Sequence, residues 1–153
     1  MSLTDREKTP TVIIAYRKPG NHLEDSFHDL KKWFKNIVVV GPENSHTSRI
    51  IEKNGGSWLV SDSPHIDELW EKGISSQSSD WYILVQDKDY LSTVLKESVV
   101  ETTLTNQTQP NFIPFDRKSF FLKQQMKYNL SWVHDPPSGL LFAPTRPVFI
   151  NEF

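Results

Sequence analysis

The sequence predicts an α/β domain with a mostly parallel central sheet that is covered by helices. Four short apolar segments alternate with stretches of helical periodicity, at residues 11–16, 37–40, 57–60 and 81–85. Each segment is apolar throughout rather than at every second position, which is typical of strands buried on both faces. Strands that alternate with helices favour right-handed crossovers and a parallel sheet.

Size and composition narrow the possible classes of protein. The chain has 153 residues, which fits one domain with a sizeable core. A formal net charge of -2 argues against a general nucleic-acid binder. The lack of cysteine excludes disulfides and cysteine-based zinc sites. No apolar run approaches the roughly 18 residues of a membrane span. We interpret residues 1–10 as a tag or disordered N-terminus and residues 11–153 as the domain.

Three helices are expected between the four strands. The first covers residues 22–35, where apolar residues recur at helical offsets from Leu23. The second begins with Ser45 or Thr47 as its N-cap and ends at the Asn-Gly-Gly of residues 54–56. The third covers residues 64–74 and carries one apolar face.

The pattern changes after residue 90. Residues 91–103 are expected to be helical, and residues 112–115 to be short and extended. Residues 116–128 predict a helix or an aromatic-rich turn. The tail from residue 139 predicts two short apolar strands around a proline-rich turn. No internal repeat and no second domain are evident.

Two aspartates follow the fourth strand, in "YILVQDKDY". Parallel strands bring their carboxyl ends to one edge of the sheet, where ligands bind. Side chains two residues apart in an extended chain point to the same side, so Asp87 and Asp89 could both reach one cation. The alternative is that both acids simply form a turn after a buried strand.

Four motifs, in order along residues 11–142, resemble the family-2 glycosyltransferases of the GT-A fold. Tyr16 and Asn21 match the spacing of the family's Y-N-E-x-x-N loop. The stretch "VVGPENSHTS" stands where the family has V-V-D-S-x-S-T-D-x-T. Asp80-Trp81 leads to "QDKDY" in place of D-x-D-E, and "RKSFFL" is followed by Trp132 and Asp135. The branch that adds glucose to the lipopolysaccharide core is the most similar.

This resemblance implies an inverting transfer of a sugar from a nucleotide-sugar donor to a glycan or glycolipid acceptor, in lipopolysaccharide or other cell-envelope synthesis. It implies a Mg²⁺ or Mn²⁺ ion held by Asp87 and Asp89, and Asp135 as the general base. It further implies nucleotide binding by Ala15, Tyr16, Asn21 and Gly41. Contacts to the acceptor or diphosphate would come from Lys88, Arg117, Lys118 and Trp132. The expected location is cytoplasmic, with contact to the inner face of a membrane left open.

The sequence also departs from the family pattern. Gly41 stands where the family has an aspartate that holds the nucleoside. Without a gap, Gln86 and Lys88 fall on the family's two aspartates, and a lysine would not suit an oxygen-ligated metal. The alternative hypothesis is therefore a non-catalytic relative that binds a partner or a glycan. Because the family pattern continues beyond this chain, we expect a truncated acceptor half.

Overall fold

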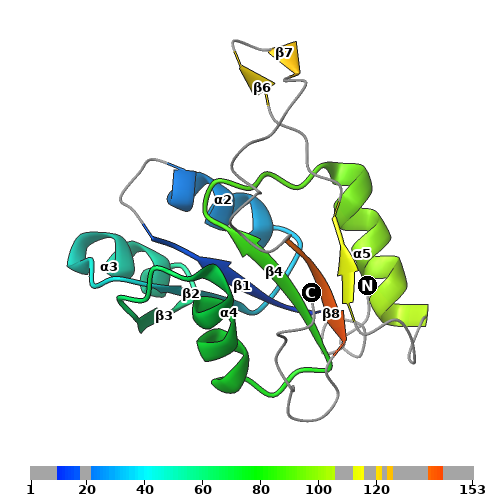
Figure 1. The fold of residues 1–153 in the computed structure, drawn as a ribbon. Helices are drawn as coiled ribbons and strands as arrows, with labels where there is room; N and C mark the ends of the chain where they lie inside the picture. Colours follow the sequence, from blue (N-terminus) through cyan, green and yellow to red (C-terminus); the bar gives the residue numbers. More distant parts are fainter. Residues whose placement is uncertain are drawn as a thin grey trace.

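The computed structural model describes residues 10–17, 22–105, 112–115, 120–121, 124–125 and 138–142. Its main feature is a six-stranded sheet with the strand order β3-β2-β1-β4-β8-β5 (Figure 1). These strands are β1 (Thr11–Ala15), β2 (Ile37–Gly41), β3 (Ser57–Val60), β4 (Trp81–Gln86), β5 (Phe112–Pro114) and β8 (Gly139–Phe142).

The first four strands are parallel neighbours, as the sequence predicted. β1 pairs with β2 on one side, from Val12↔Ile37 to Ala15↔Val40. On its other side β1 pairs with β4, and this ladder ends at Ala15↔Gln86. β8 is antiparallel to both β4 and β5, so the sheet is mixed beyond β4. The expected α/β class with a mostly parallel sheet is confirmed.

Among the described residues, four helices accompany the sheet: α2 (His22–Lys31), α3 (Ser45–Lys53), α4 (Ile66–Ser75) and α5 (Thr93–Thr105). The first helix was predicted to run to residue 35, but it ends at Lys31. The backbone carbonyl of Asn36 accepts a hydrogen bond from the Val12 N–H at 2.9 Å, so the chain has already entered the sheet by then. The N-cap of α3 is Asn44, whose Oδ1 accepts from the Thr47 N–H at 3.1 Å, rather than Ser45 or Thr47.

Strand alternation divides the core into two clusters on opposite faces of the sheet. Residues of α2, α3 and α5 pack on one face, against side chains such as Ile14, Val39 and Ile83. Residues of α4 pack on the other face, against neighbours of opposite phase such as Ile13 and Leu84. Helices therefore cover both faces of the sheet, and β1, β2 and β4 are buried as predicted. The edge strand β3 is not, because Ser57 and Val60 are exposed. We call the two faces of the sheet the α2 face and the α4 face.

The predicted helix or turn at residues 116–128 contains a two-stranded hairpin in its described part. β6 (Phe120–Phe121) pairs antiparallel with β7 (Gln124–Gln125). A helix is therefore wrong at these positions. The first expected tail strand is β8, and the second lies outside the described residues. Within the described part of the chain, no helix has the length and apolar character needed to cross a membrane.

Candidate functional site

The order of the parallel strands reverses between β1 and β4. From β1 the chain moves outward to β2 and β3, and then crosses the α4 face to add β4 on the other side of β1 (Figure 1). At such a switch point the connections leaving neighbouring strands diverge, and ligands bind in the crevice beyond the carboxyl ends. The end of β1, at Ala15–Arg17, and the end of β4, at Gln86–Asp89, therefore form the candidate site.

On the α2 face, hydrogen bonds close the turn that follows β4. The Asp87 N–H donates to the Ala15 carbonyl at 3.1 Å and extends the ladder by one residue. The Asp89 N–H then donates to the Gln86 carbonyl at 3.0 Å. The Asp89 Oδ2 accepts from the Gln86 N–H at 2.9 Å and from the Ser138 Oγ at 2.5 Å. From α2, the Ser26 Oγ donates to the carbonyls of Asp87 and Asp89 at 2.7 and 3.3 Å.

This turn differs from the geometry expected for a metal site at Asp87 and Asp89. The two carboxylates were expected to share a cation if the chain stayed extended to residue 89, but a turn occupies residues 87–88. Asp89 folds back onto the strand, which is the turn-forming behaviour of aspartate. Within the described residues, no group of three or more histidine or acidic side chains is placed to hold a metal ion.

Asp87 has the perturbed ionisation that is common at functional sites. Its side chain is half-buried, and burial raises the pKa of its carboxyl above the ordinary value. The Asp87 backbone N–H and the charges of His22 and Lys88 lower the pKa, while Asp89 raises it further. Lys88 itself is exposed. At the ligand edge, burial therefore affects the pKa of the Asp87 carboxyl more than the nearby positive charges do.

Gly41 is required by the close approach of β1. A Cβ atom at this position would lie 2.3 Å from the Tyr16 carbonyl oxygen and 2.8 Å from the Tyr16 Cδ1. The Tyr16 ring is buried and meets the edge of Trp58 at a centroid distance of 5.6 Å. Packing thus accounts for the glycine that stands where the glycosyltransferase pattern has an aspartate.

On the α4 face, the same edge carries a buried donor without a partner. Gln86 is 2% exposed, and its Nε2 has no hydrogen-bond partner. The Arg17 Nη1 donates to the Pro64 carbonyl, just before α4, at 3.1 Å. The N-cap of α4, His65, makes no side-chain capping bond. From the sequence alone, Gln86 was considered only as the residue that aligns with a family aspartate when no gap is allowed. A glutamine at the end of an apolar strand could by itself have indicated a polar contact at this edge.

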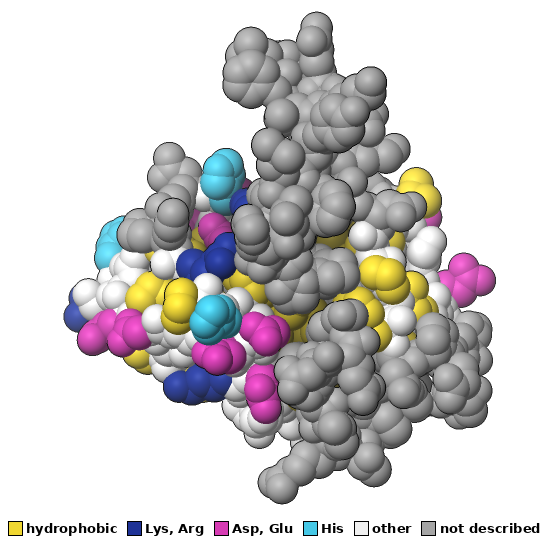
Figure 2. All heavy atoms as spheres, in the orientation of Figure 1, with side chains coloured by type: hydrophobic (Ala, Val, Ile, Leu, Met, Phe, Trp, Pro, Cys, Tyr) yellow, Lys and Arg dark blue, Asp and Glu magenta, His cyan; other side chains and the backbone are white. Residues whose placement is uncertain are grey.

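Of the remaining predicted site residues, the structure describes Ala15. Ala15 is fully buried at the end of β1, beside Gln86. The others lie outside the described residues: Asn21, Arg117, Lys118, Trp132 and Asp135. On the face seen in Figure 2, acidic, basic and histidine side chains are intermingled over the described surface, and neither sign of charge dominates.

Comparisons with known proteins identify the fold but not a family. No protein-family model and no curated protein sequence matches the chain. The structure of a cytidylyltransferase from Leptospira borgpetersenii serovar Hardjo-bovis is similar, with a TM-score of 0.60 and 16% sequence identity. The bifunctional IspDF from Campylobacter jejuni is also similar, with a TM-score of 0.52 and 9% identity.

The alignments cover most of this chain but less of its neighbours. They include 88% of this chain and 60% of the Leptospira protein, and 86% of this chain and 41% of the Campylobacter protein. At these identities the likeness establishes the fold alone, an α/β domain with a mostly parallel sheet.

The assignment to family-2 glycosyltransferases is therefore wrong, and so is the transfer of sugar to a glycan or glycolipid acceptor. Of these two similar structures, one is a cytidylyltransferase and the other is the bifunctional IspDF, and neither supports glycosyl transfer or a role in lipopolysaccharide synthesis. The motifs misled because a buried strand followed by acids arises in many parallel sheets, where aspartate also serves as a turn former. Asp89 is an example of that second role.

Proposed function

We propose that this domain binds a nucleoside triphosphate at the β1–β4 switch point and that its chemistry is nucleotidyl transfer. The observation that carries the proposal is the reversal of strand order between β1 and β4, because it opens the carboxyl edge of the sheet to a ligand. The similarity to a cytidylyltransferase structure supports a cytidine nucleotide as the first candidate.

The reaction exchanges one phosphorus–oxygen bond for another. An acceptor oxygen attacks the α-phosphorus, the bond to the bridging oxygen breaks, and pyrophosphate leaves while the acceptor's proton passes to a base or to water. Negative charge gathers on the phosphate oxygens, so the site must supply positive charge. Arg17, at the end of β1, and the exposed Lys88, after β4, are the described cations suited to this role.

A divalent cation fits Asp87 better than it fits Asp89. Asp87 is half-buried and its pKa is raised, so a nearby cation would stabilise the ionised form. The Oδ2 of Asp89 already accepts two hydrogen bonds. Magnesium in nucleotide sites binds one or two carboxylates together with phosphate oxygens and water. When bound, Mg²⁺ or Mn²⁺ would neutralise charge on the departing pyrophosphate, and Asp87 would hold it.

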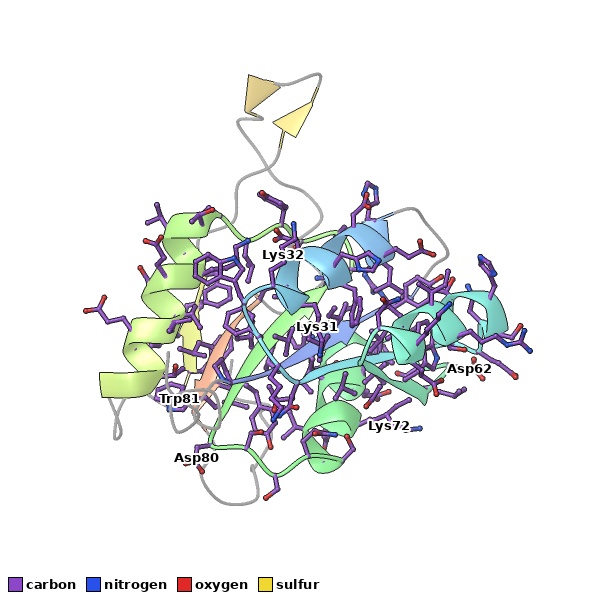
Figure 3. All side chains as sticks on the ribbon, turned by 180° about the vertical axis from the view of Figure 1, so that it is seen from behind. Lys31, Lys32, Asp62, Lys72, Asp80 and Trp81 are labelled. Carbon is purple, nitrogen blue, oxygen red and sulfur yellow. The ribbon has the colours of Figure 1, made fainter. Side chains whose placement is uncertain are left out.

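Calorimetry tests the proposal. We expect CTP to bind the wild type in MgCl₂ and to bind at least about tenfold more weakly in EDTA. Asp87→Asn should lose this dependence on Mg²⁺. The matched control is Asp80→Asn, because Asp80 is an exposed carboxylate just before β4, at the opposite end of that strand from Asp87 (Figure 3).

Three further results test the preferred base, nucleotide binding and the transfer reaction separately. UTP, ATP and GTP, titrated in parallel, identify the preferred base. If none of the four nucleotides binds at millimolar concentration, nucleotide binding is refuted. Binding with no release of pyrophosphate, across a panel of hydroxyl and phosphate-monoester acceptors, would keep the binding site and reject the transfer reaction.

A further inference from the structure

Gln86 is a buried polar side chain with one unused donor at the ligand edge of the sheet. It is 2% exposed, and its Nε2 has no hydrogen-bond partner. A buried donor without an acceptor destabilises the folded state, and such groups are rare in native proteins. Its position at the last residue of β4, beside the switch point, suggests that a ligand supplies the acceptor.

The sheet register defines the surroundings of Gln86. In β4, side chains of the same phase, Tyr82 and Leu84, belong to the core of the α4 face, so Gln86 points to that face. The register places Gln86 beside Ala15, then Val40, then Leu59. This last row of the sheet is apolar apart from Gln86. Ala15 contributes only a methyl group next to the carboxamide.

The chemistry of this row favours a nucleobase over a phosphate. A phosphate carries full negative charge and is costly to bury beside apolar side chains and a single neutral donor. A planar base is uncharged and presents neutral carbonyl and ring-nitrogen acceptors to an amide N–H. The positive groups that suit phosphates, such as Arg17, occur further along the chain beyond β1.

We infer that Gln86 is the base-reading residue of the nucleotide site, and that its Nε2 donates to a carbonyl or ring-nitrogen acceptor of the base. This inference rests on the proposed nucleotide binding. In the free protein the unused donor lowers stability, and the bound base removes that penalty. Gln86 therefore couples base recognition to the stability of the domain.

The test replaces Gln86 by a side chain of similar length without polar atoms, Gln86→Met, with Gln86→Leu as a second variant. CTP and inorganic tripolyphosphate are titrated in MgCl₂, and thermal unfolding is measured without ligand. We expect CTP to bind about tenfold more weakly to both variants and tripolyphosphate to bind unchanged. The thermal midpoint without ligand should rise by about 3 °C, because an unsatisfied donor has been removed.

Thr11→Val is the matched control. Thr11 is a fully buried polar residue at the opposite edge of the same sheet, and its hydroxyl hydrogen-bonds to the Ser79 Oγ at 2.5 Å. This variant should lower the thermal midpoint and leave CTP binding unchanged.

The outcomes separate the inference from the proposed function. If the wild type binds no nucleotide, the proposed function fails and the inference fails with it. If the wild type binds CTP but both Gln86 variants retain its affinity, only the inference is overturned. Equal weakening of CTP and tripolyphosphate would also overturn it, because Gln86 would then act on the phosphates. Weakening confined to CTP supports it.

Discussion

The two sides of the carboxyl edge differ in how the residues at the end of β4 are hydrogen-bonded. On the α2 face, Ser26, Asp89 and Ser138 hydrogen-bond the turn after β4 from three directions. On the α4 face, the Gln86 Nε2 has no partner and α4 lacks a side-chain cap. A hydrogen-bonded turn fixes the shape of a loop, whereas a buried donor without a partner is available to a ligand. Trp58, which packs with the α2-face cluster, also has a buried Nε1 without a partner. In the site proposed above, the hydrogen-bonded turn would support the ligand from the α2 face, and Gln86 would contact it from the α4 face.

The α2 face is further anchored by a buried ion pair. Lys96 of α5 is 2% exposed, and its Nζ donates to the Asp29 Oδ2 of α2 at 2.7 Å. The same ammonium lies 5.5 Å from the Trp33 ring centroid and 5.7 Å from that of Tyr90. α2 and α5 are thereby joined directly beside the turn that carries Asp87.

The largest loss of stability is expected at Gly41 in β2, which lies against Tyr16 at the end of β1. Gly41→Ala should lower the free energy of unfolding by about 3 kcal/mol, because the new Cβ meets the Tyr16 carbonyl. Urea unfolding measures this loss. Gly55→Ala is the control, since Gly55 has φ 90° but lies near only the flexible end of Lys31, and it should cost about 1 kcal/mol. Equal losses in both variants would contradict the close approach.

The ion pair comes next. Asp29→Ala should cost about 2 kcal/mol, because it leaves the buried Lys96 ammonium without its carboxylate. The estimate lies below that for a fully buried pair, since Asp29 is 25% exposed. Asp25→Ala, on the exposed side of the same helix, should cost much less. If the two variants unfold at the same urea concentration, the pair does not anchor the α2 face.

A smaller effect is expected from the hydroxyl that holds the turn. Ser26→Ala removes a donor to two backbone carbonyls and should cost about 1 kcal/mol. Hydrogen exchange of the amides at residues 87–90 should become faster, because opening of the turn is less opposed. Ser48→Ala, whose Oγ bonds only within α3, is the control and should leave that exchange unchanged.

The smallest expected effect is on how the stability of the fold depends on pH. The folded-state pKa of Asp87 is raised, so between the unfolded and folded pKa values the folded protein binds more protons than the unfolded chain. The contribution of Asp87 to stability should therefore fall as pH rises above about 4 towards the raised value. Asp87→Asn should remove this decline, making the variant more stable than wild type at pH 7 relative to pH 4. An unchanged pH profile would show that Asp87 is well solvated.

The alternation of strands and helices could be predicted because each element carries its own signal. Val38-Val39-Val40 is apolar without alternation, and both faces of β2 are indeed covered. The Asn-Gly-Gly at residues 54–56 ends α3, where Gly55 adopts the positive φ that glycine favours. The parallel order followed from the crossovers, and the expectation that Gln86 to Asp89 would lie at a ligand edge followed from the same topology.

The roles of individual residues at that edge could not be predicted, because they depend on contacts between segments distant in sequence. Asp89 turns back to the backbone of Gln86 and the hydroxyl of Ser138, which is 49 positions away. The family resemblance failed for the same reason, since it assigned chemistry from order and spacing.

The sequence by itself determined the class of the sheet, its parallel core and the loops that meet at its carboxyl edge. These follow from local hydrophobic pattern and chain connectivity. Only the tertiary structure decided that Gly41 is required by Tyr16, that Asp89 closes a turn, and that Gln86 retains an unused donor. Steric fit and hydrogen-bond pairing are properties of atoms brought together by folding, and no spacing along the chain encodes them.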